Sequence, residues 1–141
     1  MNKRFVRAVC VFFMFAFPAI ASSEDNATRV PVYFFGGEGC PHCVHEKVFL
    51  EELKKKIPAV DVHSHEVWFH PEDKKLYEKL SKAYGVSSGA VPATFVGDKV
   101  WIGYNEQRGR EIEKKVAACL ASSCIDPLRQ IDTVLGSADV V

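Results

Sequence analysis

The chain has 141 residues, 48% of them hydrophobic, and its 18 basic and 18 acidic residues leave no net charge at pH 7 with neutral histidines. This length and composition predict one globular domain and exclude collagen-like, repetitive and intrinsically disordered chains. Because no basic face is evident, we also exclude nucleic acid as a partner.

The first 21 residues have the organisation of a signal peptide. Basic residues open the segment, and an apolar run follows between Ala8 and Ile20. The run is shorter than the roughly 20 residues that span a bilayer. Small residues at Ala19 and Ala21 offer a cleavage site. We therefore expect residues 1–21 to be removed on export to the periplasm, without stable membrane insertion afterwards. An uncleaved anchor is the alternative.

Five cysteines are present, and Cys10 lies within the segment that we expect to be removed. The other four form an even number in a chain bound for an oxidising compartment, where cysteines commonly pair. Their spacing allows two pairs, Cys40 with Cys43 and Cys119 with Cys124. For the second pair we expect a structural disulfide, with a redox relay, a metal site or an intermolecular bond as alternatives.

Hydrophobic periodicity predicts the elements in chain order. Residues 22–29 are expected to be a flexible leader. Residues 30–35 are apolar at both odd and even positions, which is typical of a strand covered on both faces. A helix is expected from Pro41 to about Pro58, because proline suits the first helical position. Its expected buried face comprises Val44, Val48, Phe49, Leu53 and Ile57, and its expected polar face comprises Glu46, Lys47, Glu51, Glu52, Lys54 and Lys55.

Residues 60–69 are expected to form a second strand. Its apolar residues lie at even positions at first (Val60, Val62) and at odd positions later (Val67, Phe69), which indicates a bulge or an early strand end. A helix over residues 71–84 is expected to stop at Gly85, since glycine suits the position after a helix. A tight hairpin follows, with strands at residues 93–96 and 99–104.

The last predicted helix covers residues 106–121, with Asn105 as its N-cap. Its expected buried face comprises Ile112, Val116, Ala117 and Leu120. Residues 125–141 are a C-terminal tail with a weak helical pattern, so the folded domain is expected to span residues 30–124. The order β-α-β-α-β-β-α predicts a mixed α/β sandwich around a four-stranded sheet.

The motif Cys40-Pro41-His42-Cys43 opens the first predicted helix. Two cysteines three positions apart lie on one helical face, close enough to form a disulfide. At the N-cap, unpaired backbone N–H groups and the helix dipole favour the Cys40 thiolate, which is the nucleophilic form. His42 can stabilise this anion further when it is protonated. Cys43 lies one turn deeper and is the expected resolving thiol. We expect these four residues to be catalytic.

Together with the preceding apolar strand and with Val91-Pro92 before the hairpin, this motif makes the chain resemble the thioredoxin superfamily. The tetrapeptide is similar to the active site of DsbA-type periplasmic oxidoreductases. The chain also resembles short single-domain thioredoxins that partner bacterial membrane electron carriers. The resemblance implies a thioredoxin-like fold and disulfide exchange with client proteins, without a cofactor. It further implies that Pro92 is cis and that Val91 and Pro92 bind the client backbone.

One departure from the family pattern concerns proton transfer. Thioredoxin and DsbA-type proteins carry a buried acid on the first strand, whereas the residue six positions before Cys40 is here Phe34. The proton relay must be absent or supplied elsewhere, with Glu38 and Glu66 as candidates. The direction of electron flow is also open, because His42 favours an oxidant or isomerase and the small domain favours a reductant.

A Cys-x-x-Cys pair can instead be half of a metal site, so the alternative function is a zinc- or copper-binding module that uses Cys40, Cys43 and His45. We favour redox chemistry, because proline at the first helical position and a preceding apolar strand are features of redox helices. No second pair lies at zinc-finger spacing. No metal site is expected at His63, His65 and His70.

Overall fold

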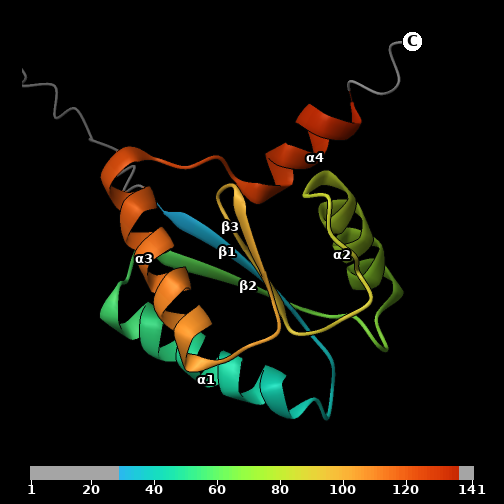
Figure 1. The fold of residues 1–141 in the computed structure, drawn as a ribbon, viewed down its shortest axis with the longest axis horizontal. Helices are drawn as coiled ribbons and strands as arrows, with labels where there is room; N and C mark the ends of the chain where they lie inside the picture. The colour runs from blue at the N-terminus through green and yellow to red at the C-terminus, as the bar shows by residue number, and fades with distance from the viewer. Residues whose placement is uncertain (1–28, 137–141) are drawn as a thin grey trace, which may run out of the picture.

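The computed structural model describes residues 29–136, so the expected signal peptide lies outside the described residues. A four-stranded sheet in the order β2-β1-β3-β4 forms the centre, with helices on both faces (Figure 1). No helix within residues 29–136 combines the length and the apolar character needed to cross a membrane.

The elements are β1 (Val30–Gly36), α1 (Pro41–Lys56), β2 (Val60–Glu66), α2 (Pro71–Ala83), β3 (Ala93–Val96), β4 (Lys99–Ile102), α3 (Glu106–Ser122) and α4 (Pro127–Leu135). β1 is parallel to β2 and antiparallel to β3, and β3 forms an antiparallel hairpin with β4. This topology confirms the predicted mixed α/β sandwich. β2 ends at Glu66, which accounts for the change of parity in the sequence.

The central strand β1 is buried on both faces, as its apolar sequence predicts. Val32 and Phe34 pack with α1 and α3, whereas Tyr33 and Phe35 pack with α2. Alternate strand residues point to opposite faces, so β1 divides the interior into two hydrophobic layers. The layer between β1 and α1 also contains both sulfurs of the Cys-Pro-His-Cys motif.

The buried face of α1 agrees only in part with the expected one. Leu53 is buried as expected, and Phe49 and Ile57 pack against the core. Val44 and Val48 are 55% and 51% exposed, so placing them in the core was wrong. The residues that are buried follow Cys43 at steps of three and four, the spacing of one helical face: Glu46, Leu50 and Leu53. Because Cys43 is packed against β1, it determines which side of the helix faces the sheet.

The prediction for the buried face of α3 also needs correction. Ile112 and Val116 are buried as expected, but Ala117 and Leu120 are exposed, and Cys119 takes their place in the core. Asn105 caps the helix as predicted, because its side chain accepts the backbone N–H of the third helical residue at 2.9 Å.

The C-terminal segment contains a helix that the sequence only weakly indicated. Cys124 is bonded to Cys119, which fastens the chain where α3 ends. Beyond this disulfide, α4 packs against α2 on the opposite side of the sheet from α1 (Figure 1). Leu128 and Ile131 of α4 contact the aromatic layer there.

Candidate active site

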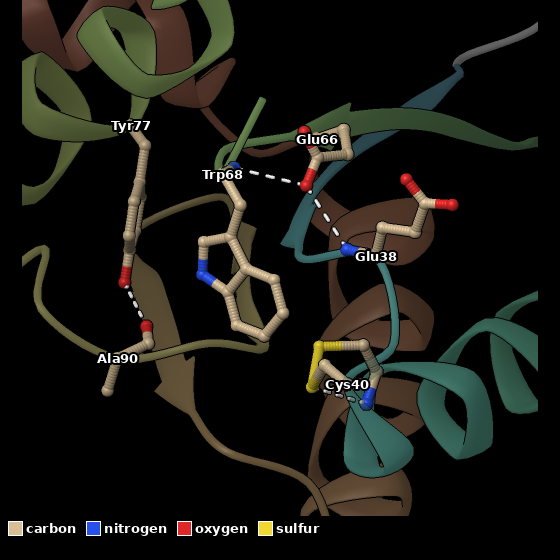
Figure 2. Close-up of a disulfide and its surroundings, with 7 residues drawn as sticks. Glu38, Cys40, Glu66, Trp68, Tyr77 and Ala90 are labelled. Carbon is tan, nitrogen blue, oxygen red and sulfur yellow. Dashed lines mark hydrogen bonds between the residues drawn. A yellow bond between two sulfur atoms is a disulfide. The ribbon is translucent and has the colours of Figure 1, made fainter. Parts of the chain in front are cut away.

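Cys40 occupies the N-cap of α1, where the sequence placed it. Its Sγ accepts the backbone N–H of Cys43 at 3.2 Å, and Pro41 is the first residue of the helix. Cys40 and Cys43 form a disulfide with Cα atoms 5.2 Å apart (Figure 2). In the reduced protein, an N–H directed at Sγ and the positive end of the helix dipole both favour a thiolate at Cys40.

The two sulfurs differ in access to solvent. Cys40 is 7% exposed and Cys43 is 1% exposed, while Pro41 and His42 between them are exposed. An incoming sulfur therefore reaches Cys40 first. Cys43 faces the interior and is bonded to the sulfur of Cys40.

Trp68 covers the loop that leads into the disulfide. A Cβ added at Gly37 would lie 2.3 Å from the indole, so only glycine allows this contact. The Glu66 carboxylate accepts the backbone N–H groups of Glu38 at 3.1 Å and Trp68 at 3.0 Å (Figure 2). It also accepts the backbone N–H of Phe69 at 2.7 Å. Glu66 thus joins the loop before the motif to the turn after β2.

Neither expected candidate for a buried acid is buried. Glu38 is exposed, and the Glu66 carboxylate is committed to the three backbone groups. Partial burial tends to raise the pKa of Glu66, but these hydrogen bonds outweigh it and hold the pKa below its ordinary value. Glu66 is therefore an anion that organises the loop.

The buried acid is Glu46, which the sequence pattern places on the polar face of the helix. It is 1% exposed, and one carboxylate oxygen accepts the Thr94 hydroxyl at 2.7 Å. The other oxygen has no hydrogen-bond partner among the described residues. Burial raises the pKa of Glu46 to about 7, against the opposing effects of the Thr94 hydrogen bond and the Arg108 charge. Its three-residue step after Cys43 is the sequence signal that could have revealed it.

A groove of about 720 Å³ lies beside the loop that ends at Pro92, with Trp68, Tyr77 and Val91 among its lining residues. The Val91–Pro92 peptide bond is cis, and the Pro92 side chain is buried. Tyr77 donates its hydroxyl to the Ala90 carbonyl at 2.5 Å, which anchors this loop to α2 (Figure 2).

The histidines of β2 contact an aspartate and a tyrosine side chain. The His65 Nδ1 lies 2.7 Å from an Asp73 oxygen, and the His63 ring stacks on Tyr33 with centroids 4.7 Å apart. Over residues 29–136, no three His, Cys, Asp or Glu side chains are grouped so as to hold a metal ion.

Similarity to solved structures identifies the fold. Thioredoxin O2 from Arabidopsis thaliana, solved in its oxidised state, is 21% identical with a TM-score of 0.50, over 64% of this chain and 76% of that one. A putative thiol:disulfide interchange protein DsbE from Chlorobium tepidum is 15% identical with a TM-score of 0.51, over 68% of this chain and 83% of that one. The chain has the thioredoxin fold.

Sequence similarity defines the family more closely. No family model matches the chain. A glutaredoxin from Haemophilus influenzae is 33% identical over an alignment of 73 residues, and the match covers 48% of this chain and 75% of that relative. The chain belongs to the glutaredoxin family. With Cys40 and Cys43 joined at the start of α1, it is a thiol–disulfide oxidoreductase.

Proposed function

We propose that the protein is exported to the periplasm, where it exchanges disulfides with client proteins through Cys40 and Cys43. The position of Cys40 carries this proposal: its Sγ lies at a helix N-terminus with a backbone N–H directed at it, and its partner sulfur is sheltered. The Cys-Pro-His-Cys sequence supports a DsbA-type exchange, because the exposed His42 can stabilise the Cys40 anion when protonated.

The exchange uses a mixed disulfide in either direction. The Cys40 thiolate attacks a client disulfide, forms a Cys40–client bond and releases one client thiolate. Cys43 then attacks the Cys40 sulfur, which closes the Cys40–Cys43 disulfide and releases the second client thiolate. The client gains two electrons and the motif loses two. When the motif starts oxidised, a client thiolate attacks Cys40 and the same steps run in reverse.

The groove beside Val91 offers a place for an extended client segment. Its Trp68 edge is 53% exposed, and the adjacent Phe69 is exposed as well. Exposed aromatic side chains beside a reactive sulfur suit an apolar client segment, and the backbone of Val91 is available to pair with an extended chain. A membrane electron carrier that renews the redox state of the motif would use the same surface.

Export is supported by two independent features. The N-terminal segment has the pattern of a signal peptide, and the Cys119–Cys124 disulfide suits an oxidising compartment. N-terminal sequencing of the protein recovered from a periplasmic extract tests this part of the proposal. Recovery of uncleaved protein from the cytoplasmic fraction alone would contradict it.

The activity is tested with two substrates, the disulfides of insulin and the thiols of reduced, unfolded ribonuclease. We expect exchange with at least one of them and its loss in Cys40→Ser. The matched control removes the other disulfide with Cys119→Ala and Cys124→Ala, which we expect to leave the exchange intact. A wild-type protein inactive on both substrates refutes the proposal. Titration of the motif against glutathione then determines the direction of electron flow.

A further inference from the structure

We propose that Glu46 is the proton relay for Cys43, accepting its thiol proton when Cys43 attacks and returning a proton when Cys43 leaves. This inference rests on the disulfide exchange proposed above and adds a residue to it. It assigns to α1 the role for which the first strand offers only Phe34.

The side chains of Cys43 and Glu46 lie on the same buried face of α1, one turn apart, and each is 1% exposed. Residues three apart on a helix have Cβ atoms about 5–6 Å from each other, which places the carboxyl within direct or water-mediated reach of the sulfur. Cys43 does not exchange its proton directly with solvent, because its own helix and β1 cover it.

The neighbouring strands hold the carboxyl in this layer. A Cβ at Gly36 would lie 3.4 Å from the Cys43 Cβ and 2.8 Å from the Phe34 ring, so these two side chains meet at one point of β1. Phe34 is paired with Thr94 of β3, and the Thr94 hydroxyl donates to Glu46. The acid therefore reaches from the helix to the strand position that faces Phe34.

The carboxyl has one oxygen available for the proton. Oε1 accepts from Thr94, whereas Oε2 is buried and has no hydrogen-bond partner among the described residues. Arg108 of α3 and Tyr104 before α3 are the titratable groups that interact with the carboxyl from outside α1. Since burial outweighs the Arg108 charge and brings the pKa of Glu46 to about 7, both its acid and its base forms are populated at neutral pH.

Proton transfer accompanies the closing and opening of the Cys40–Cys43 disulfide. In the Cys40–client mixed disulfide, the Glu46 carboxylate takes the proton of the Cys43 thiol, and the resulting thiolate attacks the Cys40 sulfur. The Cys40–Cys43 bond forms, the Cys40–client bond breaks, and the client thiolate takes a proton from solvent. In reverse, Cys43 leaves as a thiolate and takes its proton from the Glu46 carboxylic acid.

Rapid-mixing kinetics separate the two steps. The reduced protein is mixed with a peptide disulfide, and the formation and decay of the mixed disulfide are followed between pH 5 and 9. We expect decay in the wild type to accelerate with pH through about 7 as Glu46 ionises, and then to level off. In Glu46→Gln we expect no inflection near pH 7 and decay at least about tenfold slower at that pH. The control Glu51→Gln changes an exposed acid of the same helix and should match the wild type.

The outcomes distinguish this inference from the proposed function. If the wild type forms no mixed disulfide, the proposed exchange is refuted. If it forms one and Glu46→Gln keeps both the rate of decay and its inflection, the exchange stands and the relay is refuted. Should Glu46→Gln fail to fold, carboxyl-labelled wild-type protein decides by NMR. We expect the Glu46 signal to titrate differently in the oxidised and reduced proteins, and an identical titration overturns the relay.

Discussion

Glu46→Gln should change how the stability of the oxidised protein depends on pH. The pKa of Glu46 rises from its ordinary value of 4.5 to about 7 in the folded protein, chiefly through burial. Between these values the folded protein holds a proton that the unfolded chain has released, so stability falls as pH increases through this window and is constant above it. At about 1.4 kcal/mol per pH unit, the wild type loses about 3 kcal/mol that Glu46→Gln does not lose.

The assay is urea unfolding of both oxidised proteins at several pH values from 4.5 to 8.5. The test depends on how the difference in unfolding free energy between Glu46→Gln and the wild type changes with pH. Its absolute value is less informative, because glutamine can also shift stability by a constant amount through altered packing. All other groups titrate in both proteins and cancel. Across this pH range we expect the free energy of unfolding of Glu46→Gln to rise by about 3 kcal/mol relative to that of the wild type. The free energy of unfolding of Glu51→Gln should follow that of the wild type at every pH. A constant difference between Glu46→Gln and the wild type would refute the raised pKa.

Three further changes test neighbouring contacts. Thr94→Val removes the hydroxyl that lowers the pKa of the buried carboxyl, so the inflection in mixed-disulfide decay should move to higher pH; an unchanged inflection would contradict this assignment. Gly37→Ala places a Cβ against the indole of Trp68, so we expect altered tryptophan fluorescence and slower attack on a peptide disulfide, whereas unchanged values would show that the indole moves freely. Replacing Cys119 and Cys124 by alanine should lower the free energy of unfolding by about 2 kcal/mol, as urea titration would measure, and retained stability would exclude the bridge as a structural element.

The parts of the fold that the sequence predicted are those determined locally. The apolar run of β1, the proline that opens α1 and the glycine turn of the hairpin each specify their element within a few neighbouring residues. The Cys-Pro-His-Cys motif belongs to the same group, because three-residue spacing at the start of a helix is enough to bring the sulfurs together.

The side of a helix that faces the core is a tertiary property, and here the sequence was misleading. In α1, valines at positions 44 and 48 gave an apolar stripe, but the packing of Cys43 against β1 turns that stripe toward solvent and Glu46 inward. The hydrogen-bond partner that makes this burial tolerable is Thr94, 48 residues further along the chain. No local pattern links these two positions. The same holds for Trp68, whose contact with Gly37 joins two loops that are distant in sequence.

The energetic balance at Glu46 itself argues for a role in the reaction. A carboxyl with one unpaired oxygen in a hydrophobic layer destabilises the fold at neutral and alkaline pH, and an apolar side chain of similar volume would pack there without that cost. Polar side chains at positions where packing favours an apolar residue are expected at sites whose chemistry requires them. Cys43, one turn away on the same buried face, is a group whose chemistry requires a proton acceptor, since it must ionise in the same layer, away from water, before it can close the disulfide. With both sulfurs and the acid on α1, one rigid helix fixes the spacing between nucleophile, resolving thiol and proton acceptor.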